Sequence, residues 1–112
     1  MEISFRTKKL ERQCCDSKVA NKKLGADQAT KLRRRLDDMR AAANLGALRP
    51  PFPGRCHELK ADRVGQLSID LVHPYRLVFS PSADPPPERP DGGLDWDLVT
   101  SVTITGIEDT HG

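Results

Sequence analysis

Residues 55–79, RCHELKADRVGQLSIDLVHPYRLVF, decide the fold of this chain. Apolar and polar side chains alternate over residues 66–71 and again over residues 75–79, which is the pattern of strands with one buried face. Residues 57–60 predict a further strand, and the ADRVG that follows predicts the turn to the next one. Strands that follow each other this closely indicate an antiparallel sheet.

The N-terminal residues predict a short strand followed by a helix. Residues 2–5 alternate apolar and polar side chains, and Thr7 can end this strand by capping a helix. Leu10 and Cys14 then lie on one face of that helix. The apolar pattern weakens near CCDSK, and Gly25 is a break in the chain. One helix is therefore expected between the first strand and Gly25.

A second helix is predicted from a stripe of apolar side chains that must pack on another part of the protein. The stripe residues recur at intervals of three and four along the chain, and they are Ala29, Leu32, Leu36, Met39 and Ala43. The helix is expected to end near residues 44–46, ahead of the proline-stiffened loop RPPFPG.

Two segments complete the chain. Residues 80–93, SPSADPPPERPDGG, contain five prolines and two glycines, which is typical of a mobile loop rather than a helix or strand. Within this segment we interpret residues 81–93 as a loop insertion. The β-branched residues at 99–107 predict a last strand.

Helices early in the chain and strands late predict an α+β domain. We expect two N-terminal helices packed on one face of a twisted, mainly antiparallel sheet of four to five strands. The other face of the sheet would be open to water or to a ligand. With 112 residues, the whole chain 1–112 is expected to form a single domain.

The composition favours a cytoplasmic protein with a polyanionic partner. The N-terminus lacks the apolar core of a signal peptide, no apolar run is long enough to span a membrane, and three cysteines argue against a disulfide framework. Residues 1–63 carry 16 Lys and Arg against 8 Asp and Glu, whereas residues 64–112 carry 2 against 8. A basic front half is typical of nucleic-acid binding, and a pair of solvated basic helices is the alternative.

The cysteines do not predict a metal site. Cys14 and Cys15 are adjacent and cannot easily both point at one metal ion, and the chain has no C-x-x-C pair to complete a set with Cys56 and His57. Cys14 on the helix stripe is better explained as a small core residue. We expect neither a metal nor another cofactor.

Four segments, in their order and spacing, resemble the RelE/ParE superfamily of toxins, and most of all the HigB branch of bacterial toxin–antitoxin modules. They are SFRTKKLE, HELKADRVGQLSI, PYRLVF and the ending IEDTH. The resemblance covers most of the chain outside residues 81–93. It implies a RelE-like microbial-RNase fold and metal-independent cleavage of mRNA in the ribosomal decoding site, which inhibits translation.

The resemblance also implies partners. A HigA-like helix-turn-helix antitoxin would neutralise the protein in a hetero-oligomer and connect it to operator DNA. The other partners would be mRNA on the ribosome and ribosomal RNA, and no membrane is expected.

The resemblance transfers catalytic roles to five positions. His57 and Lys60 match the histidine and lysine of the LHxLKGDR run of the family, and Arg76 matches the arginine of its WR strand. Asp109 and His111 match the acid and the terminal histidine of its DYH ending.

The sequence departs from the family pattern at three positions. Thr110 stands where the family usually has tyrosine, and Leu67 and Tyr75 replace tryptophans. If the missing tyrosine stacks on or polarises the nucleotide, activity is reduced or depends more on His111.

The chemistry of these side chains fits metal-free RNA cleavage, in which the 2′-hydroxyl of the substrate is the nucleophile. Histidine titrates near ~6.5 and suits the two proton transfers, and the planar fork of Arg76 suits the phosphate. Asp109 could orient an imidazole or act as a base. We expect His57, Arg76 and His111, from three separate strands or strand ends, to converge on one phosphate. An ion pair of Arg76 with Asp70 across the hairpin is the alternative role of that arginine.

Basic residues elsewhere are assigned to ribosomal RNA, whose phosphates they would neutralise. They are Lys8, Lys9, Arg12, Lys22, Lys23, Arg33, Arg34, Arg35 and Arg63. A solvated helix face is again the alternative.

Three other functions stay open. A ParE-like gyrase inhibitor would share the fold without needing His57 and His111. A degenerate relative would bind RNA or its antitoxin without cutting, and Thr110 is compatible with it. A general RNA-binding module is disfavoured because the chain has only five aromatic residues for base stacking.

Overall fold

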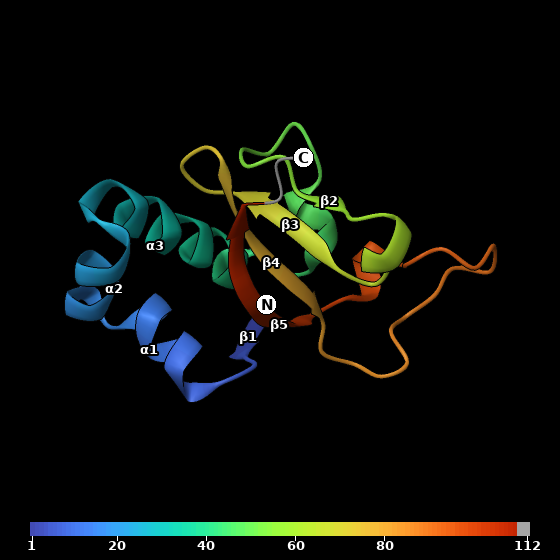
Figure 1. Cartoon of the computed structure of the whole chain (residues 1–112). Coiled ribbons are helices and arrows are strands. Elements are labelled where there is room, and N and C mark those ends of the chain that lie inside the picture. Colours follow the sequence, from blue (N-terminus) through green and yellow to red (C-terminus); the bar gives the residue numbers. More distant parts are fainter. Residues whose placement is uncertain (110–112) are drawn as a thin grey trace.

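Five strands form one sheet in the order β1-β5-β4-β3-β2 (Figure 1). They are β1 Glu2–Phe5, β2 His57–Glu58, β3 Leu67–Asp70, β4 Tyr75–Pro81 and β5 Ser101–Asp109. The computed structural model describes residues 1–109 of the chain. β1 pairs with β5 in parallel, and the other three pairs are antiparallel. The expected α+β fold with a mainly antiparallel sheet is confirmed.

Three helices are present where the sequence predicted two. They are α1 Lys8–Cys15, α2 Ser17–Leu24 and α3 Ala26–Ala41. The additional helix begins at Asp16, whose carboxylate accepts hydrogen bonds from the backbone N–H groups of Lys18 and Val19 at 3.0 and 3.3 Å. This N-cap lies in the CCDSK segment where the apolar pattern weakens, so a cap rather than periodicity starts the helix. Thr7 caps α1 as predicted, at 3.1 Å from the N–H of Leu10.

Several predicted boundaries were wrong by a few residues. α3 ends at Ala41, so Ala43 lies beyond the helix. The strand predicted at 57–60 is reduced to β2, because Lys60 already begins the short 3-10 helix Ala61–Arg63. The last strand begins at Ser101 rather than at residue 99, since residue 99 instead accepts a hydrogen bond from Leu45 at the start of the 3-10 helix Leu45–Leu48.

One continuous core joins α3 to a single face of the sheet. Leu32, Leu36 and Met39 of the predicted stripe are at most 1% exposed. The sheet side chains of the same cluster are Leu67, Ile69, Leu77, Phe79, Val102 and Ile104. Burial of this apolar surface is the main term that stabilises the fold.

The opposite face of the sheet carries most of the polar strand side chains, although Ser68 and Val78 in its middle are buried. Residues paired across antiparallel strands point to the same face, and two rows of such residues run over this face. The first row consists of His57, Ser68, Val78 and Gly106. The second row consists of Asp70, Arg76 and Glu108. We call this surface the open face.

The predicted proline-rich loop starts later than expected, because Ser80 and Pro81 belong to β4 and pair with Thr103 and Val102 of β5. Residues 82–95 contain no helix or strand, as expected for the rest of the segment up to residue 93, and one bridge among them joins Glu88 to Leu94. They form the long loop at the right of Figure 1. The loop returns to the sheet at the 3-10 helix Trp96–Leu98, where the indole N–H of Trp96 donates to the carboxylate of Glu58 at 3.0 Å. Among residues 1–109, no helix is long and apolar enough to cross a membrane.

Candidate functional site

His57 and Arg76, two of the predicted catalytic residues, lie on the same open face. They stand in neighbouring rows, and only β3 separates their strands. Standard strand spacings then put their Cα atoms roughly 12 Å apart. A long arginine side chain can cover much of this distance, so one phosphate could contact both residues.

Arg76 is held against a carboxylate of the neighbouring strand. Its Nε lies 3.4 Å from Oδ1 of Asp70, its direct partner in the β3–β4 pair. The cross-strand ion pair, the alternative role considered for this arginine, is therefore present. The Nη groups of Arg76 make no hydrogen bond within residues 1–109, so both can still donate to a phosphate.

His57 is exposed at the edge strand of the sheet. Its Nδ1 lies 2.9 Å from the carbonyl oxygen of Arg55. A carbonyl oxygen can only accept, so Nδ1 carries the proton of the neutral ring and Nε2 is left as the acceptor. This tautomer suits a general base that takes a proton at Nε2.

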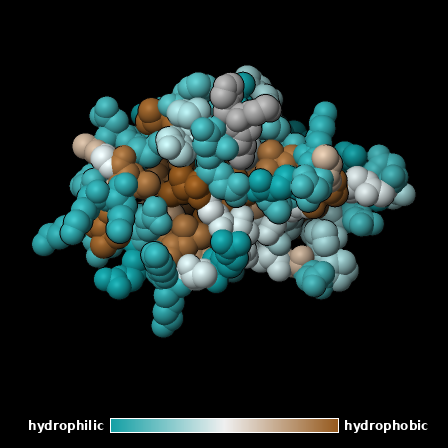
Figure 2. Space-filling view, viewed as in Figure 1, coloured by the Kyte–Doolittle hydropathy of each residue, from teal (hydrophilic) through white to brown (hydrophobic). Residues whose placement is uncertain are grey.

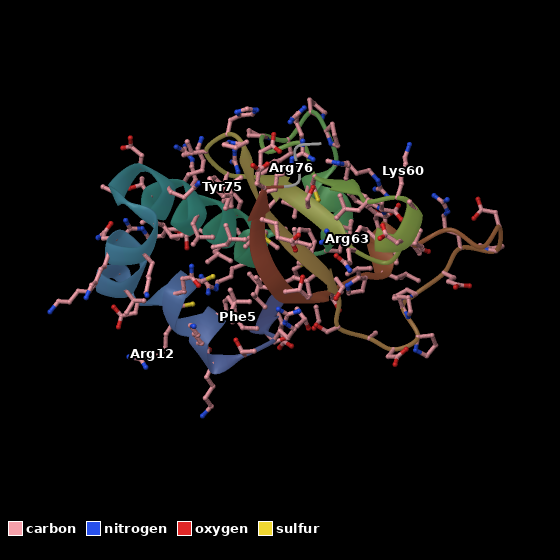
Figure 3. All side chains as sticks on the ribbon, viewed as in Figure 1. Phe5, Arg12, Lys60, Arg63, Tyr75 and Arg76 are labelled. Carbon is pink, nitrogen blue, oxygen red and sulfur yellow. The ribbon has the colours of Figure 1, made fainter. Side chains whose placement is uncertain are left out.

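Two further predicted catalytic residues, Lys60 and Asp109, are not brought into this arrangement. Lys60 is exposed beyond the end of β2, on the far side of the sheet from the helices in Figure 3, and contacts neither His57 nor Arg76. Asp109 pairs with Tyr75, and strand alternation turns it to the face opposite Arg76. The predictions for Thr110 and His111 lie outside the described residues.

Arg63 was assigned to RNA, but its guanidinium already has protein partners. Its two Nη groups donate to the carboxylate of Glu108 at 3.1 and 2.9 Å, and its Nε donates to Gln66 at 2.9 Å. The hydrogen bonds to Glu108 raise the pKa of Arg63 further above its ordinary value. Arg63 thus forms an ion pair that spans the open face, and its contact with RNA stays a prediction.

Arg35 was also assigned to RNA. This assignment is corrected, because the side chain is buried. The residue is only 7% exposed. Its Nε donates to the backbone carbonyl of Asp70 at 2.9 Å, and its Nη1 lies 3.5 Å from Asp38. Its spacing of three from Leu32 and of four from Met39 was the available signal, because residues three and four apart lie on the same helix face.

Five of the predicted RNA-binding residues do gather in one place. A groove of about 420 Å³ runs between α1 and α2, and its six lining residues are Lys8, Lys9, Arg12, Val19, Lys22 and Lys23. No acidic residue lines it, so its charge is not neutralised locally. Figure 2 shows long hydrophilic side chains projecting from this side of the molecule. We call this feature the basic groove. In Figure 3, Arg12 lies at the opposite end of the molecule from Lys60 and well away from Arg76.

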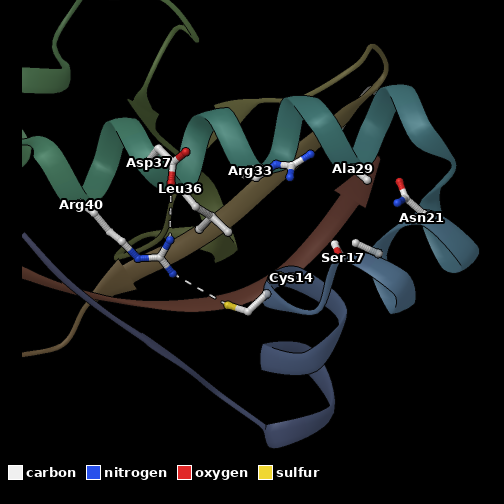
Figure 4. A pocket seen from close by; sticks show the side chains of 10 residues that line it. Cys14, Ser17, Asn21, Ala29, Arg33, Leu36, Asp37 and Arg40 are labelled. Atoms are coloured by element: carbon white, nitrogen blue, oxygen red, sulfur yellow. Dashed lines mark hydrogen bonds and ion pairs between the residues drawn. The ribbon is translucent and has the colours of Figure 1, made fainter.

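A second cavity, of about 200 Å³, lies among the three helices (Figure 4). It is lined by Cys14, Cys15, Arg33 and Arg40 among others, so Arg33 faces this cavity rather than the basic groove. Burial raises the pKa of Cys14 to about 12, which keeps its thiol neutral and a poor nucleophile. Within residues 1–109, no group of three or more His, Cys, Asp and Glu side chains could hold a metal ion.

Sequence reasoning missed Arg55 as a member of the site and named Asp70 only as a partner of Arg76. The carboxylate of Asp70 lies between two arginines, with Oδ2 2.6 Å from Nε of Arg55 and Oδ1 3.4 Å from Nε of Arg76. The hydrogen bond to Asp70 raises the pKa of Arg55. Arg55 comes directly before Cys56 in a loop with no periodic pattern, so only the register of β3 could reveal this contact.

Comparison with solved structures shows what the fold is. The chain is similar to YoeB from Staphylococcus aureus in a YoeB–YefM complex, with 18% identity over 96% of this chain and 94% of that chain and a TM-score of 0.55. It is similar to a YoeB dimer from the same organism, with 19% identity, the same coverage and a TM-score of 0.53. The fold is therefore of the RelE/YoeB microbial-RNase type. No family model matches the sequence, and no curated protein is significantly similar to it.

Proposed function

We propose that this protein is the toxin of a type II toxin–antitoxin module, a member of the RelE superfamily that cleaves mRNA on the ribosome. The observation that carries the proposal is that the same face of a YoeB-like fold holds an imidazole with an accepting Nε2 and a guanidinium whose Nη groups make no hydrogen bond within residues 1–109. The first group can move a proton, and the second can hold a phosphate.

The proposed reaction uses the 2′-hydroxyl of the RNA. His57 takes the proton of this hydroxyl at Nε2, and the oxygen attacks the adjacent phosphorus. Arg76 stabilises the negative charge that develops on the phosphoryl oxygens. Lys60, the family lysine, would add positive charge only from beyond the end of β2. The bond to the 5′-oxygen breaks, and the leaving oxygen takes a proton, a role for which His111 is our candidate, with Asp109 either orienting an imidazole or acting as a base.

The basic groove would anchor the protein to ribosomal RNA. Its five cations lie far from Arg76 in Figure 3, so they would hold RNA away from the bond that is cut. Contacts of this kind add affinity without sequence preference, and the affinity falls steeply with salt. Cleavage would then depend on the ribosome, because the contact between the basic groove and ribosomal RNA would be needed in addition to the contact with mRNA.

An antitoxin is the proposed protein partner. YoeB, which shares the fold, has been solved in complex with YefM. From the HigB resemblance we propose a HigA-like helix-turn-helix antitoxin that forms a hetero-oligomer with this chain in the cytoplasm and carries it to operator DNA.

A second candidate is a relative that binds without cutting, including a ParE-like gyrase inhibitor. Two observations favour it. Asp109 faces away from Arg76, and Thr110 stands where the family usually has tyrosine. Both weaken the argument for a complete catalytic set.

Brief induction of the protein in bacteria, followed by mapping of transcript ends, separates these candidates. We expect cuts within translated mRNAs for the wild type and loss of the cuts and of growth arrest for Arg76→Ala, because a positioned charge or proton-transfer group contributes on the order of 10²-fold or more. Arg89→Ala is the matched control, since Arg89 is an exposed arginine paired with Asp91 in the proline-rich loop. Equal toxicity of Arg76→Ala at equal expression, or DNA breaks in place of mRNA ends, would contradict the proposal.

A further inference from the structure

Two arginines from different segments share one carboxylate on the open face. Asp70 is the last residue of β3, Arg76 lies opposite it on β4, and Arg55 lies in the loop before β2. Both arginines contact Asp70 through Nε, at 2.6 Å for Arg55 and 3.4 Å for Arg76. One negative charge thus faces two positive charges, and the cluster keeps an excess positive charge.

The carboxylate that joins them is fixed in place. The backbone N–H of Asp70 donates to the carbonyl of Gly54 at 2.7 Å, and its backbone carbonyl accepts from the buried Arg35 at 2.9 Å. These two contacts tie the end of β3 to the loop on one side and to α3 on the other. Asp70 is therefore a rigid anchor, and its side chain determines where the two guanidinium groups lie.

The backbone at Arg55 is held in an unfavourable conformation. Its φ is +48°, in the left-handed region that side-chain-bearing residues rarely adopt. This conformation is maintained by the hydrogen bond of Gly54 to Asp70 and by the contact of the Arg55 carbonyl with His57. Backbone strain of this kind is concentrated at functional sites. Arg55, in a loop at the edge of the sheet, is therefore a candidate for ligand binding as well as for turning the chain.

The free edges of both guanidinium groups remain available. The side chain of Arg55 is 70% exposed, and its Nη groups, like those of Arg76, make no hydrogen bond within residues 1–109. A small cavity of about 30 Å³ lies between them, lined by Asp70 and Tyr75 as well. A cavity of this size takes one water molecule or one oxygen atom of a larger anion.

We propose that Arg55 and Arg76 together form one oxyanion-binding site for a phosphate of RNA, with Asp70 as the positioning residue. Each guanidinium keeps Nε on Asp70 and turns its two Nη groups to the phosphate, which is the geometry in which arginine binds oxyanions most strongly. This site deepens the proposed function. It rests on that function only in taking the bound phosphate to be a phosphate of RNA. It adds Arg55, which the sequence did not single out, to the residues that contact the substrate.

The test is a titration followed by NMR on the Nε–Hε signals of the arginines. The probes are inorganic phosphate and a short single-stranded RNA whose 2′-O-methyl groups prevent cleavage. We expect the signals of Arg55 and Arg76 to move together with one dissociation constant, while the signal of Arg89 stays in place. Arg55→Ala should weaken binding of both probes about tenfold, and Arg89→Ala should leave it unchanged.

Asp70→Asn tests whether Asp70 positions the two arginines. The readout is the pair of dissociation constants of the two arginine signals, which a loss of stability alone does not separate. Without the shared carboxylate, the two arginine signals should titrate with different dissociation constants, while the melting temperature reports folding separately. An unmoved Arg55 signal, or equal weakening by Arg55→Ala and Arg89→Ala, would overturn the proposal. If both arginines bind phosphate but the protein does not cleave mRNA, the nuclease function alone is overturned. If the protein cleaves mRNA but the NMR signal of Arg55 does not move, this site alone is overturned.

Discussion

Arg63, in the turn before β3, reaches over β4 to Glu108 on β5 and forms two hydrogen bonds with its carboxylate, at 3.1 and 2.9 Å. The pair joins two segments that are far apart in the chain. It crosses the open face where His57 and Arg76 also lie. Its strength determines how firmly the turn before β3 is held against the sheet.

Arg63→Ala should lower the melting temperature by a small amount, on the order of 2 °C, because both side chains are about one third exposed and water screens the pair. Glu108→Gln should have a similar effect. The melting temperature of the double variant should fall by less than the sum of the two single decreases, since the ion pair can be broken only once. Thermal melts of the four proteins at low and high salt check this, and additive losses would contradict a direct coupling.

Asp16→Ala should selectively destabilise α2. The carboxylate caps two backbone N–H groups at the start of this helix, and loss of such a cap typically costs about 1 kcal/mol. Urea unfolding measures the total change, and amide hydrogen exchange of residues 17–24 measures the local one. Asp27→Ala is the control, because Asp27 lies in the first turn of α3, which has no side-chain cap hydrogen bond. Equal effects of the two variants would show that the cap has no special role.

The stability of the protein should fall as the pH rises above about 9. Burial raises the pKa of Cys14 and of Cys56 from 9.0 to about 12. A thiol whose pKa is higher in the folded state contributes its full stabilisation below pH 9, and this is lost as the pH rises toward 12. Urea midpoints at about pH 8 and about pH 11 measure the decline.

The decline should be shallower in Cys56→Ala than in the wild type, because one buried titratable group has been removed. Cys15→Ala is the matched control, since this neighbouring thiol is exposed. The comparison uses the change between the two pH values rather than the absolute stability, which Cys56→Ala also lowers through the core. A decline that Cys15→Ala reduces as much as Cys56→Ala would contradict the role of burial.

Replacing Lys8 and Lys22 of the basic groove by alanine should weaken RNA binding without changing sequence preference. Each lost phosphate contact should reduce the slope of log affinity against log salt by about 0.7 for single-stranded RNA. Fluorescence anisotropy with a short RNA at several salt concentrations measures this slope. Arg89→Ala is the control, because Arg89 is an exposed arginine of the proline-rich loop, outside the groove and not assigned to RNA. The groove has no role in RNA binding if the slope is unchanged.

Local patterns were enough to predict much of the fold. The stripe of Leu32, Leu36 and Met39 packs as the spacing requires, and Thr7 caps α1 as its residue type suggests. Both features depend on residues that lie within one or two helical turns of each other, so they can be predicted from a short stretch of sequence. The helix at residues 17–24 was missed, because a single polar cap at Asp16 starts it and no apolar period marks it.

The candidate site depended on contacts that no local pattern encodes. The sequence indicated that His57 and Arg76 belong to separate strands of a sheet with an open face, and it named the basic residues that line the groove. Only the tertiary structure decided that Arg35 is buried and that Asp109 faces away from Arg76. It also joined Arg55 to Asp70. The physical reason is strand register, because a shift of one residue turns every side chain to the other face, and register is set by packing between segments far apart in the chain.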